Sequence, residues 1–309
     1  MKREALPPSS NTGGKFSPHQ SQPAHVDALA FSFRHEGFTH ADLPAFCCLL
    51  TRFLPNLLAA PRRGGWMGFT HSAELSIGGL IAWGGDHQRG RVFVSLMGHA
   101  CALVTDWAGF AQWLQETDAR LSRVDLAYDD LDGTTYPVSR ALEDYRAGGF
   151  TSGGNAPSFK LIESGSLDSA SARTLYVGKR ENGKMCRVYD KGRQLEDSVH
   201  PDWVRVELEL RAKDRVIPFE VLTNPTQYLA GAYPALSWLS ELRAVVRTAR
   251  RIIHRTLDQL AEWAQRQTGR VLHALAMHHG GDLFAVFDRI KRAELPSRLL
   301  GADQLLGAT

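Results

Sequence analysis

Residues 184–194, KMCRVYDKGRQ, place side chains that can do chemistry at alternate positions. Residues two apart on a strand point to the same side, so Arg187, Tyr189 and Lys191 would share one face. A tyrosine phenol has a pKa of about 10 and is a weak nucleophile at neutral pH. A guanidinium and a metal-polarised phosphate beside it would make attack on a phosphodiester feasible. That attack leaves a phosphotyrosine and a free 3′-hydroxyl, so the strand can be rejoined later.

Two other segments alternate in the same way and supply paired acids. RVDLAYD, residues 123–129, puts Asp125 and Asp129 on one face, and RVELELR, residues 205–211, does the same with Glu207 and Glu209. A half-solvated strand is the ordinary explanation for any one such segment. Three of them in one region favour a site. If the strands are neighbours, the four carboxylates converge, and a hard divalent cation such as Mg²⁺ or Mn²⁺ would relieve their repulsion.

Competing chemistries have weaker support. Residues 178–184 fit the start of a phosphate-binding loop, but Met185 stands where Ser or Thr is required. The dipeptide Asn182-Gly183 predicts a hairpin turn between two strands instead. Tyr176 is the rival nucleophile, although TLYV is typical of an apolar strand in which a tyrosine has a structural role.

The elements that must position these residues follow from periodicity. Residues 25–34 and 122–133 predict two similar strands, each followed by a helix, at 41–60 and 137–150, and then by further strands. Residues 106–121 predict one more helix. The similarity of HVDALAFSF to RVDLAYDDL indicates a degenerate internal duplication, with Phe31 where the second copy has Asp129. We therefore expect an α+β fold with an antiparallel sheet core, helices on one face, and chemistry in the second copy alone.

The C-terminal part predicts a long amphipathic helix over residues 237–270, with a net charge of +4 against +3 for the whole chain. Its arginines are candidates for contacts with backbone phosphates of DNA. A solvated helix face is nearly as good an explanation. The candidate DNA-binding residues are Arg243, Arg247, Arg250, Arg251 and Arg255.

Composition limits the class of protein. The chain has 309 residues, 43% of them hydrophobic, with no apolar run of membrane-spanning length, so a soluble protein is expected. Residues 1–24 are rich in Pro, Ser, Gly and Gln and predict a disordered tail rather than a signal peptide. The four cysteines show no metal-binding spacing and indicate a reducing compartment. The expected domains are the 1–24 tail, a 25–236 catalytic domain with its site in 122–215, and a helical 237–309 region.

Three ordered segments together resemble the replication initiation factor family: SRVDLAYDDLDG, TLYVGKRENGKMCRVYDKGRQ and WVRVELELRAKDRVIP. That family includes the RstA-type rolling-circle initiators of filamentous phages and, more distantly, the trans-acting Rep proteins of staphylococcal-type plasmids. The resemblance covers roughly residues 25–235. It implies nicking of a double-stranded origin, a covalent tyrosine link and a divalent metal.

Carried onto this sequence, the resemblance implies Tyr189 as the nucleophile with Arg187 beside it, and the alternation of the strand adds Lys191 on the same face. Its acidic motifs fall on Asp125, Asp129, Glu207 and Glu209, without assigning metal ligands and bases among them. A phage or prophage initiator in the cytoplasm of a bacterial host is the expected function. The expected partners are origin DNA, the nicked single strand and a host helicase, and the expected assembly is a homodimer that matches inverted repeats.

Two alternatives stay open. The first is a DNA-binding replication or transcription regulator of the same fold that does not cut. The second is a nuclease that uses metal-bound water, with Tyr189 in a structural role.

Overall fold

The computed structural model describes residues 24–164, 171–213, 215–239 and 257–291. The chain divides into two compact units, Met1–Ala249 and Arg250–Thr309. Within the described residues, no helix is long and apolar enough to cross a membrane.

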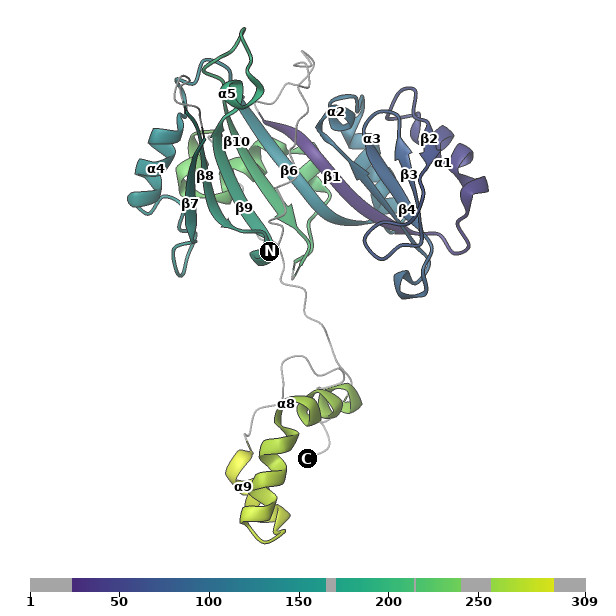
Figure 1. Cartoon of the computed structure of the whole chain (residues 1–309), viewed down its shortest axis with the longest axis vertical. Helices are drawn as coiled ribbons and strands as arrows, with labels where there is room; N and C mark the ends of the chain where they lie inside the picture. The colour runs from purple at the N-terminus through teal and green to yellow at the C-terminus, as the bar shows by residue number, and fades with distance from the viewer. Residues whose placement is uncertain (1–23, 165–170, 214, 240–256, 292–309) are drawn as a thin grey trace. The chain divides into compact units, whose positions relative to one another are not determined.

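Ten strands of the first unit form one antiparallel sheet (Figure 1). Their order is β2-β3-β4-β5-β1-β6-β10-β9-β8-β7, which places the two longest strands at the centre. The strands are β1 (Ala24–Arg34), β2 (Ala59–Pro61), β3 (His71–Leu75), β4 (Gly79–Trp83), β5 (Arg91–Leu96), β6 (Arg120–Asp130), β7 (Phe159–Ser164), β8 (Ala172–Lys179), β9 (Lys184–Asp190) and β10 (Val204–Arg211).

Helices α1, α3, α4 and α7 pack on one face of this sheet and enclose the core. Phe31 of β1 is fully buried there, against Phe33, Phe110 and Trp113. The helices of the first unit are α1 (Leu43–Leu50), α2 (Gly98–Ala102), α3 (Trp107–Glu116), α4 (Val138–Arg146), α5 (Lys191–Leu195), α6 (Glu220–Thr223) and α7 (Pro225–Ala232). The second unit contains α8 (Leu257–His278) and α9 (Leu283–Ile290). The expected α+β fold, with an antiparallel sheet and helices on one face, is confirmed.

The strand order is symmetric about the β1–β6 pair. Outward from that pair the first half reads β1-β5-β4-β3-β2 and the second half reads β6-β10-β9-β8-β7. Along the chain, each half is a long strand, then a helix (α1 or α4), then four more strands. This repeated order supports the internal duplication inferred from the two similar strand sequences.

The residue comparison drawn from that duplication is wrong in one detail. Phe31 lies in the core, whereas Asp129 points to the opposite face of the sheet, where it pairs with Arg205. Strand β1 has register shifts between Val26 and Ala28 and between Ala30 and Phe31. A bulge changes which residues face each side, so positions matched by sequence do not match by direction.

Several predicted elements end earlier than expected, and the helix predicted for 106–121 is one of them, since α3 ends at Glu116 and β6 begins at Arg120. The helix predicted for 41–60 stops at Leu50, because Pro55 follows and Asn56 adopts a positive φ of 55°. GRVFVSLMGHACALV, residues 90–104, reads as one β-like segment, but β5 ends at Leu96 and α2 begins at Gly98. Of the C-terminal helix predicted for 237–270, residues 257–270 belong to α8, residues 237–239 belong to a 3-10 helix (Pro234–Leu239), and residues 240–256 lie outside the described part of the chain.

The hairpin predicted from Asn182-Gly183 joins β8 to β9. Gly183 has a φ of 74°, a conformation that glycine adopts without a steric penalty. Its N–H donates to the carbonyl of Arg180 and closes the turn. Since a strand follows rather than a helix, this segment is not a phosphate-binding loop.

We predict that Phe31→Ala destabilises the first unit by about 3–5 kcal/mol, because it leaves a cavity among buried aromatic rings. The free energy of unfolding is measured by urea denaturation. Phe159→Ala is the matched control, since Phe159 lies in the same unit and is 52% exposed, and it should change that free energy by about 1 kcal/mol or less. Equal effects of the two substitutions would contradict the position of the core.

Candidate active site

Strands β6, β10 and β9 bring the predicted residues onto the sheet face opposite the helices, which we call the polar face. Glu207 on β10 lies opposite Ala127 on β6 and Arg187 on β9. Opposed residues of an antiparallel pair point to the same side. The same register sets Arg205 between Asp129 and Tyr189, and Glu209 between Asp125 and Met185.

Tyr189 lies at the centre of this face and bonds to an acid. Its hydroxyl donates to Oε2 of Glu207 over 3.3 Å. The guanidinium of Arg187 pairs with the other oxygen of Glu207 and lies 5.1 Å from the centre of the Tyr189 ring. Tyr189 is only 4% exposed, and burial, with the Glu207 charge added, raises the pKa of its phenol. The phenol therefore needs a base before it can act as a nucleophile.

A second cluster surrounds Arg205. Its Nε and Nη2 donate to the two oxygens of Asp129 over 2.6 and 2.7 Å, and its Nη1 donates to Asp27 over 2.7 Å. The indole of Trp203 also donates to Asp129, over 2.8 Å. Burial opposes ionisation of Asp129, but the Arg205 charge lowers its pKa overall. Asp129 is therefore an ionised, fully bonded group.

A third cluster surrounds Glu209. Its carboxylate pairs with Arg211, accepts from Nε of Arg180 over 3.0 Å and lies 3.6 Å from Arg123. Arg123 also donates to Asp125 through Nε over 2.8 Å. The side chains of Arg123, Arg180 and Arg211 are 28%, 34% and 37% exposed. They form the water-accessible rim of the polar face.

Guanidinium groups, rather than a cation from solution, balance the four predicted carboxylates. Asp125, Asp129, Glu207 and Glu209 each bond to at least one arginine. Burial raises the pKa of Asp125, with repulsion from the two glutamates added and Arg123 opposing. Among the residues that the structure describes, no group of three or more His, Cys, Asp or Glu side chains is arranged to hold a metal. The carboxylates as arranged do not fit a bound Mg²⁺ or Mn²⁺.

Lys191 begins α5, just beyond the end of β9. It is 2% exposed, and its ammonium lies 4.8 Å from the ring centre of Trp203. In the part of the chain described here it forms no ion pair within 4.0 Å. Burial lowers the pKa of Lys191 to about 8, with the nearby Arg205 charge acting in the same direction. A cation held in this way is suited to an incoming anion.

The rival nucleophile Tyr176 also belongs to this face. It is half-buried on β8, directly opposite Arg187, while its neighbours Leu175 and Val177 are buried in the core. Tyr176 therefore shares the side of the sheet on which Arg187 lies. Tyr176 is more accessible than Tyr189, although its hydroxyl bonds to no described acid.

Sequence reasoning missed Asp27 and His25, which reach the site from β1. His25 Nε2 lies 3.9 Å from Asp27 and 3.8 Å from Asp129. The signal was available, since Asp27 matches Asp125 in the repeated strand sequence. The five candidate arginines between 243 and 255 lie outside the described residues.

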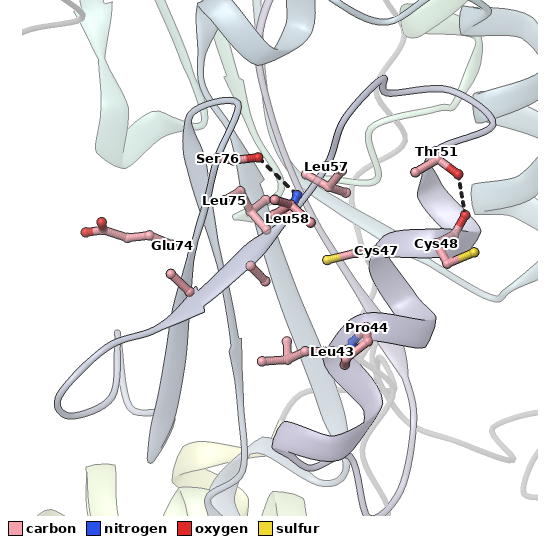
Figure 2. Close-up of a pocket in the computed structure, with 12 residues that line it drawn as sticks. Leu43, Pro44, Cys47, Cys48, Thr51, Leu57, Leu58, Glu74, Leu75 and Ser76 are labelled. Atoms are coloured by element: carbon pink, nitrogen blue, oxygen red, sulfur yellow. Dashed lines mark hydrogen bonds between the residues drawn. The ribbon is translucent and has the colours of Figure 1, made fainter.

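An apolar groove of about 920 Å³ lies elsewhere, between α1 and the β2–β3 edge of the first half (Figure 2). Cys47, Cys48 and Leu58 are among its lining residues, and Glu74 is the charged side chain among the described residues that line it. None of the predicted site residues that the structure describes lines this groove, so it is separate from the chemistry of the polar face.

We predict that Arg205→Met destabilises the first unit by about 3–5 kcal/mol, because it leaves two buried carboxylates without a counter-charge. Urea denaturation at neutral pH measures the loss. Arg34→Met is the control, because the Arg34–Glu36 pair is well exposed at 64% and 71%, and it should cost less than about 1 kcal/mol. A loss for Arg205→Met no greater than for the control would show that the buried pairs do not hold the strands together.

Comparison with known proteins bears on the family and on the fold. Residues 119–251 match the replication initiation factor family, a range that includes β6, β9 and β10. The fold is similar to that of the rolling-circle replication initiator protein from Geobacillus stearothermophilus, with a TM-score of 0.53 and 19% identity over 67% of this chain and 83% of that chain. No curated protein matches the chain. The resemblance expected from the sequence is confirmed: residues 119–251 match the replication initiation factor family, and the fold is similar to that of a rolling-circle initiator.

Proposed function

We propose that this protein starts rolling-circle replication of a phage or prophage by nicking and rejoining DNA at a double-stranded origin, with Tyr189 as the nucleophile. The observation that carries the proposal is the hydrogen bond from the Tyr189 hydroxyl to Glu207, 3.3 Å long, beside the guanidinium of Arg187. A nucleophile, a base that can take its proton and a cation for the phosphate thus lie side by side.

Glu207 acts as the general base in this proposal. It takes the phenolic proton, and the Tyr189 oxygen forms a bond to phosphorus as the bond from phosphorus to the 3′-oxygen breaks. The leaving 3′-oxygen takes a proton from water. The products are a 5′-phosphotyrosine and a free 3′-hydroxyl, and the reverse steps rejoin the strand.

Arg187 and Lys191 stabilise the negative charge that builds up on the phosphate in the transition state. The rim arginines Arg123, Arg180 and Arg211 attract the backbone on either side. The acids of the polar face do not repel the DNA, because arginines already balance them. Asp125 and Glu209 therefore serve to position these arginines, whereas Asp129 positions Arg205.

Mg²⁺ or Mn²⁺ enters the proposal as a requirement to be measured, and no step above depends on it. A host helicase and a homodimer on inverted repeats are further parts of the proposal. Nicking assayed with and without EDTA, on supercoiled plasmids carrying fragments of the source genome, tests the metal requirement directly.

A specific observation favours a second candidate, a non-cutting DNA-binding regulator of the same fold. Tyr189 is nearly inaccessible at 4% exposure, and each predicted carboxylate is paired with an arginine. Such a regulator would retain origin binding and show no nicking under any metal condition. That combination would decide against the nicking proposal.

We predict that Tyr189→Phe abolishes nicking of the plasmid library, with a loss of at least about 10³-fold, whereas Tyr176→Phe keeps activity within about tenfold. The reason is that Glu207 can take a proton from Tyr189, while no described acid bonds to Tyr176. Nicks are mapped by sequencing, and SDS-resistant protein–DNA complexes are counted on gels. The reverse ranking would make Tyr176 the nucleophile, and nicking retained by both variants would indicate attack by water.

We also predict a pH dependence set by Lys191. Its ammonium is charged below its pKa of about 8 and neutral above it, so the nicking rate should fall as the pH rises through that value. The charged groups that face it are Arg205, Asp27, Asp129 and Glu207. In Lys191→Arg the fall in nicking rate should move to higher pH. Lys191→Met should nick slowly, at a rate that does not change with pH over this range. The same fall in Lys191→Met would show that another group titrates.

A further inference from the structure

The first half of the sheet presents a polar face of its own, beside the catalytic one. Arg34 on β1 lies opposite Arg91 on β5, and Ser32 on β1 lies opposite Arg120 on β6. Opposed residues share a side, so Arg34, Arg91 and Arg120 stand together on the side away from the helices. Like charges placed directly opposite one another destabilise a sheet unless something balances them.

In the catalytic half, acids balance the arginines; here they do so only in part. Arg34 pairs with Glu36 over 2.6 Å. Within the described ranges, neither Arg91 nor Arg120 forms an ion pair with an acidic side chain inside 4.0 Å. Burial lowers the pKa of Arg91, and the charges of Arg120 and Arg34 add to that effect, with Asp118 opposing.

The Arg91 guanidinium is nevertheless held in place. Its Nε donates to Oγ of Ser32 over 3.0 Å, and its Nη2 donates to the Ser32 carbonyl over 2.6 Å. An arginine fixed by neutral groups, beside like charges, is suited to an anionic ligand.

The repeated strand order shows how the two halves differ. Strand β5 reads RVFVSL, and the corresponding part of β10 reads RVELEL, on strands at equivalent places in the order. Phe93 and Ser95 stand where the second half has Glu207 and Glu209. The first half therefore has the arginine without the acids, and so has cations without a base.

We propose that this face, formed by Arg34, Arg91, Arg120 and Phe93, binds the phosphodiester backbone of DNA next to the scissile site. Strand β6 is common to both faces, since it contributes Arg120 to one and Asp125 to the other, so one DNA strand can cross from the binding half to the catalytic half. The half-buried Phe93 ring adds a surface against which an unpaired base can stack. The proposal rests on the proposed function, because it takes origin DNA as the ligand.

Fluorescence anisotropy measures binding of the full-length protein to a labelled DNA of random sequence, about 25 nucleotides long. One arm of the experiment uses double-stranded DNA and the other uses single-stranded DNA. Arg91→Gln/Arg120→Gln should weaken binding by about tenfold or more near physiological salt and lower the slope of log K against log salt by about 1–2. A larger loss in the single-stranded arm assigns the face to the displaced strand, and a larger loss in the duplex arm assigns it to the duplex.

Arg52→Gln/Arg146→Gln is the matched control, since it removes the same charge from exposed positions near α1 and α4. It should bind within about twofold of wild type. Circular dichroism checks folding. Should Arg91→Gln/Arg120→Gln not fold, Arg120→Glu alone, at an exposed position with no side-chain hydrogen bond to a described residue, should weaken binding in the same way.

The inference is overturned if the arginine variants bind DNA as tightly as the control variant and with the same salt slope. This holds even where wild-type nicking is intact. Loss of nicking in Tyr189→Phe with unchanged binding leaves the inference standing, because it concerns a different face. Absence of DNA binding by the wild type overturns both the inference and the proposed function.

Discussion

The pairing of buried acids with arginines across β6, β10 and β9 is the interaction on which the rest of the structure depends. A buried carboxylate without a counter-charge is prohibitively costly, and removing one partner of such a pair typically costs several kcal/mol. Asp129, Glu207 and Glu209 each meet an arginine of a neighbouring strand. Asp125 pairs with Arg123 of its own strand, and Arg123 also lies 3.6 Å from Glu209 on β10. A slip of one residue in any of these strands would turn the acids into the helix-covered core, so the same pairs fix the register of the sheet. Tyr189 meets Glu207 because that register is fixed.

Two halves of similar architecture use this arrangement differently. The first half fills its core with aromatic side chains and presents arginines without acids, whereas the second half carries the tyrosine and the acids. The halves are not independent, because Asp27 of β1 bonds to Arg205 of β10. The family match begins at residue 119 and so leaves out β1. Strand β1, which contributes Asp27 to the candidate site, therefore lies outside the residues that match the family.

The alternation in residues 123–129, 184–191 and 205–211 was sufficient to predict the strands and which residues share a side, because a period of two is a local property of the backbone. Arginine–acid pairing could not be predicted in the same way, since it depends on the order β6-β10-β9, which brings distant segments together. Four converging acids predict a bound metal only where no arginines lie between them, and here arginines pair with all four. The place of Asp27 depends on a bulge in β1, and the direction of Tyr176 depends on the register with β9. Local alternation predicts neither the bulge nor the register, although the match of Asp27 to Asp125 in the repeated sequence was a signal.

The central claim is that Tyr189, held by Glu207 and Arg187, forms the covalent bond to DNA. The most direct measurement is mass spectrometry of the protein–DNA adduct after digestion with nuclease and trypsin. Tryptic cleavage separates the two candidate tyrosines, with Tyr189 in residues 188–191 (VYDK) and Tyr176 in residues 174–179 (TLYVGK). The account predicts a nucleotide mass on VYDK alone. A nucleotide on TLYVGK, or nicked DNA with both peptides unmodified, would contradict it.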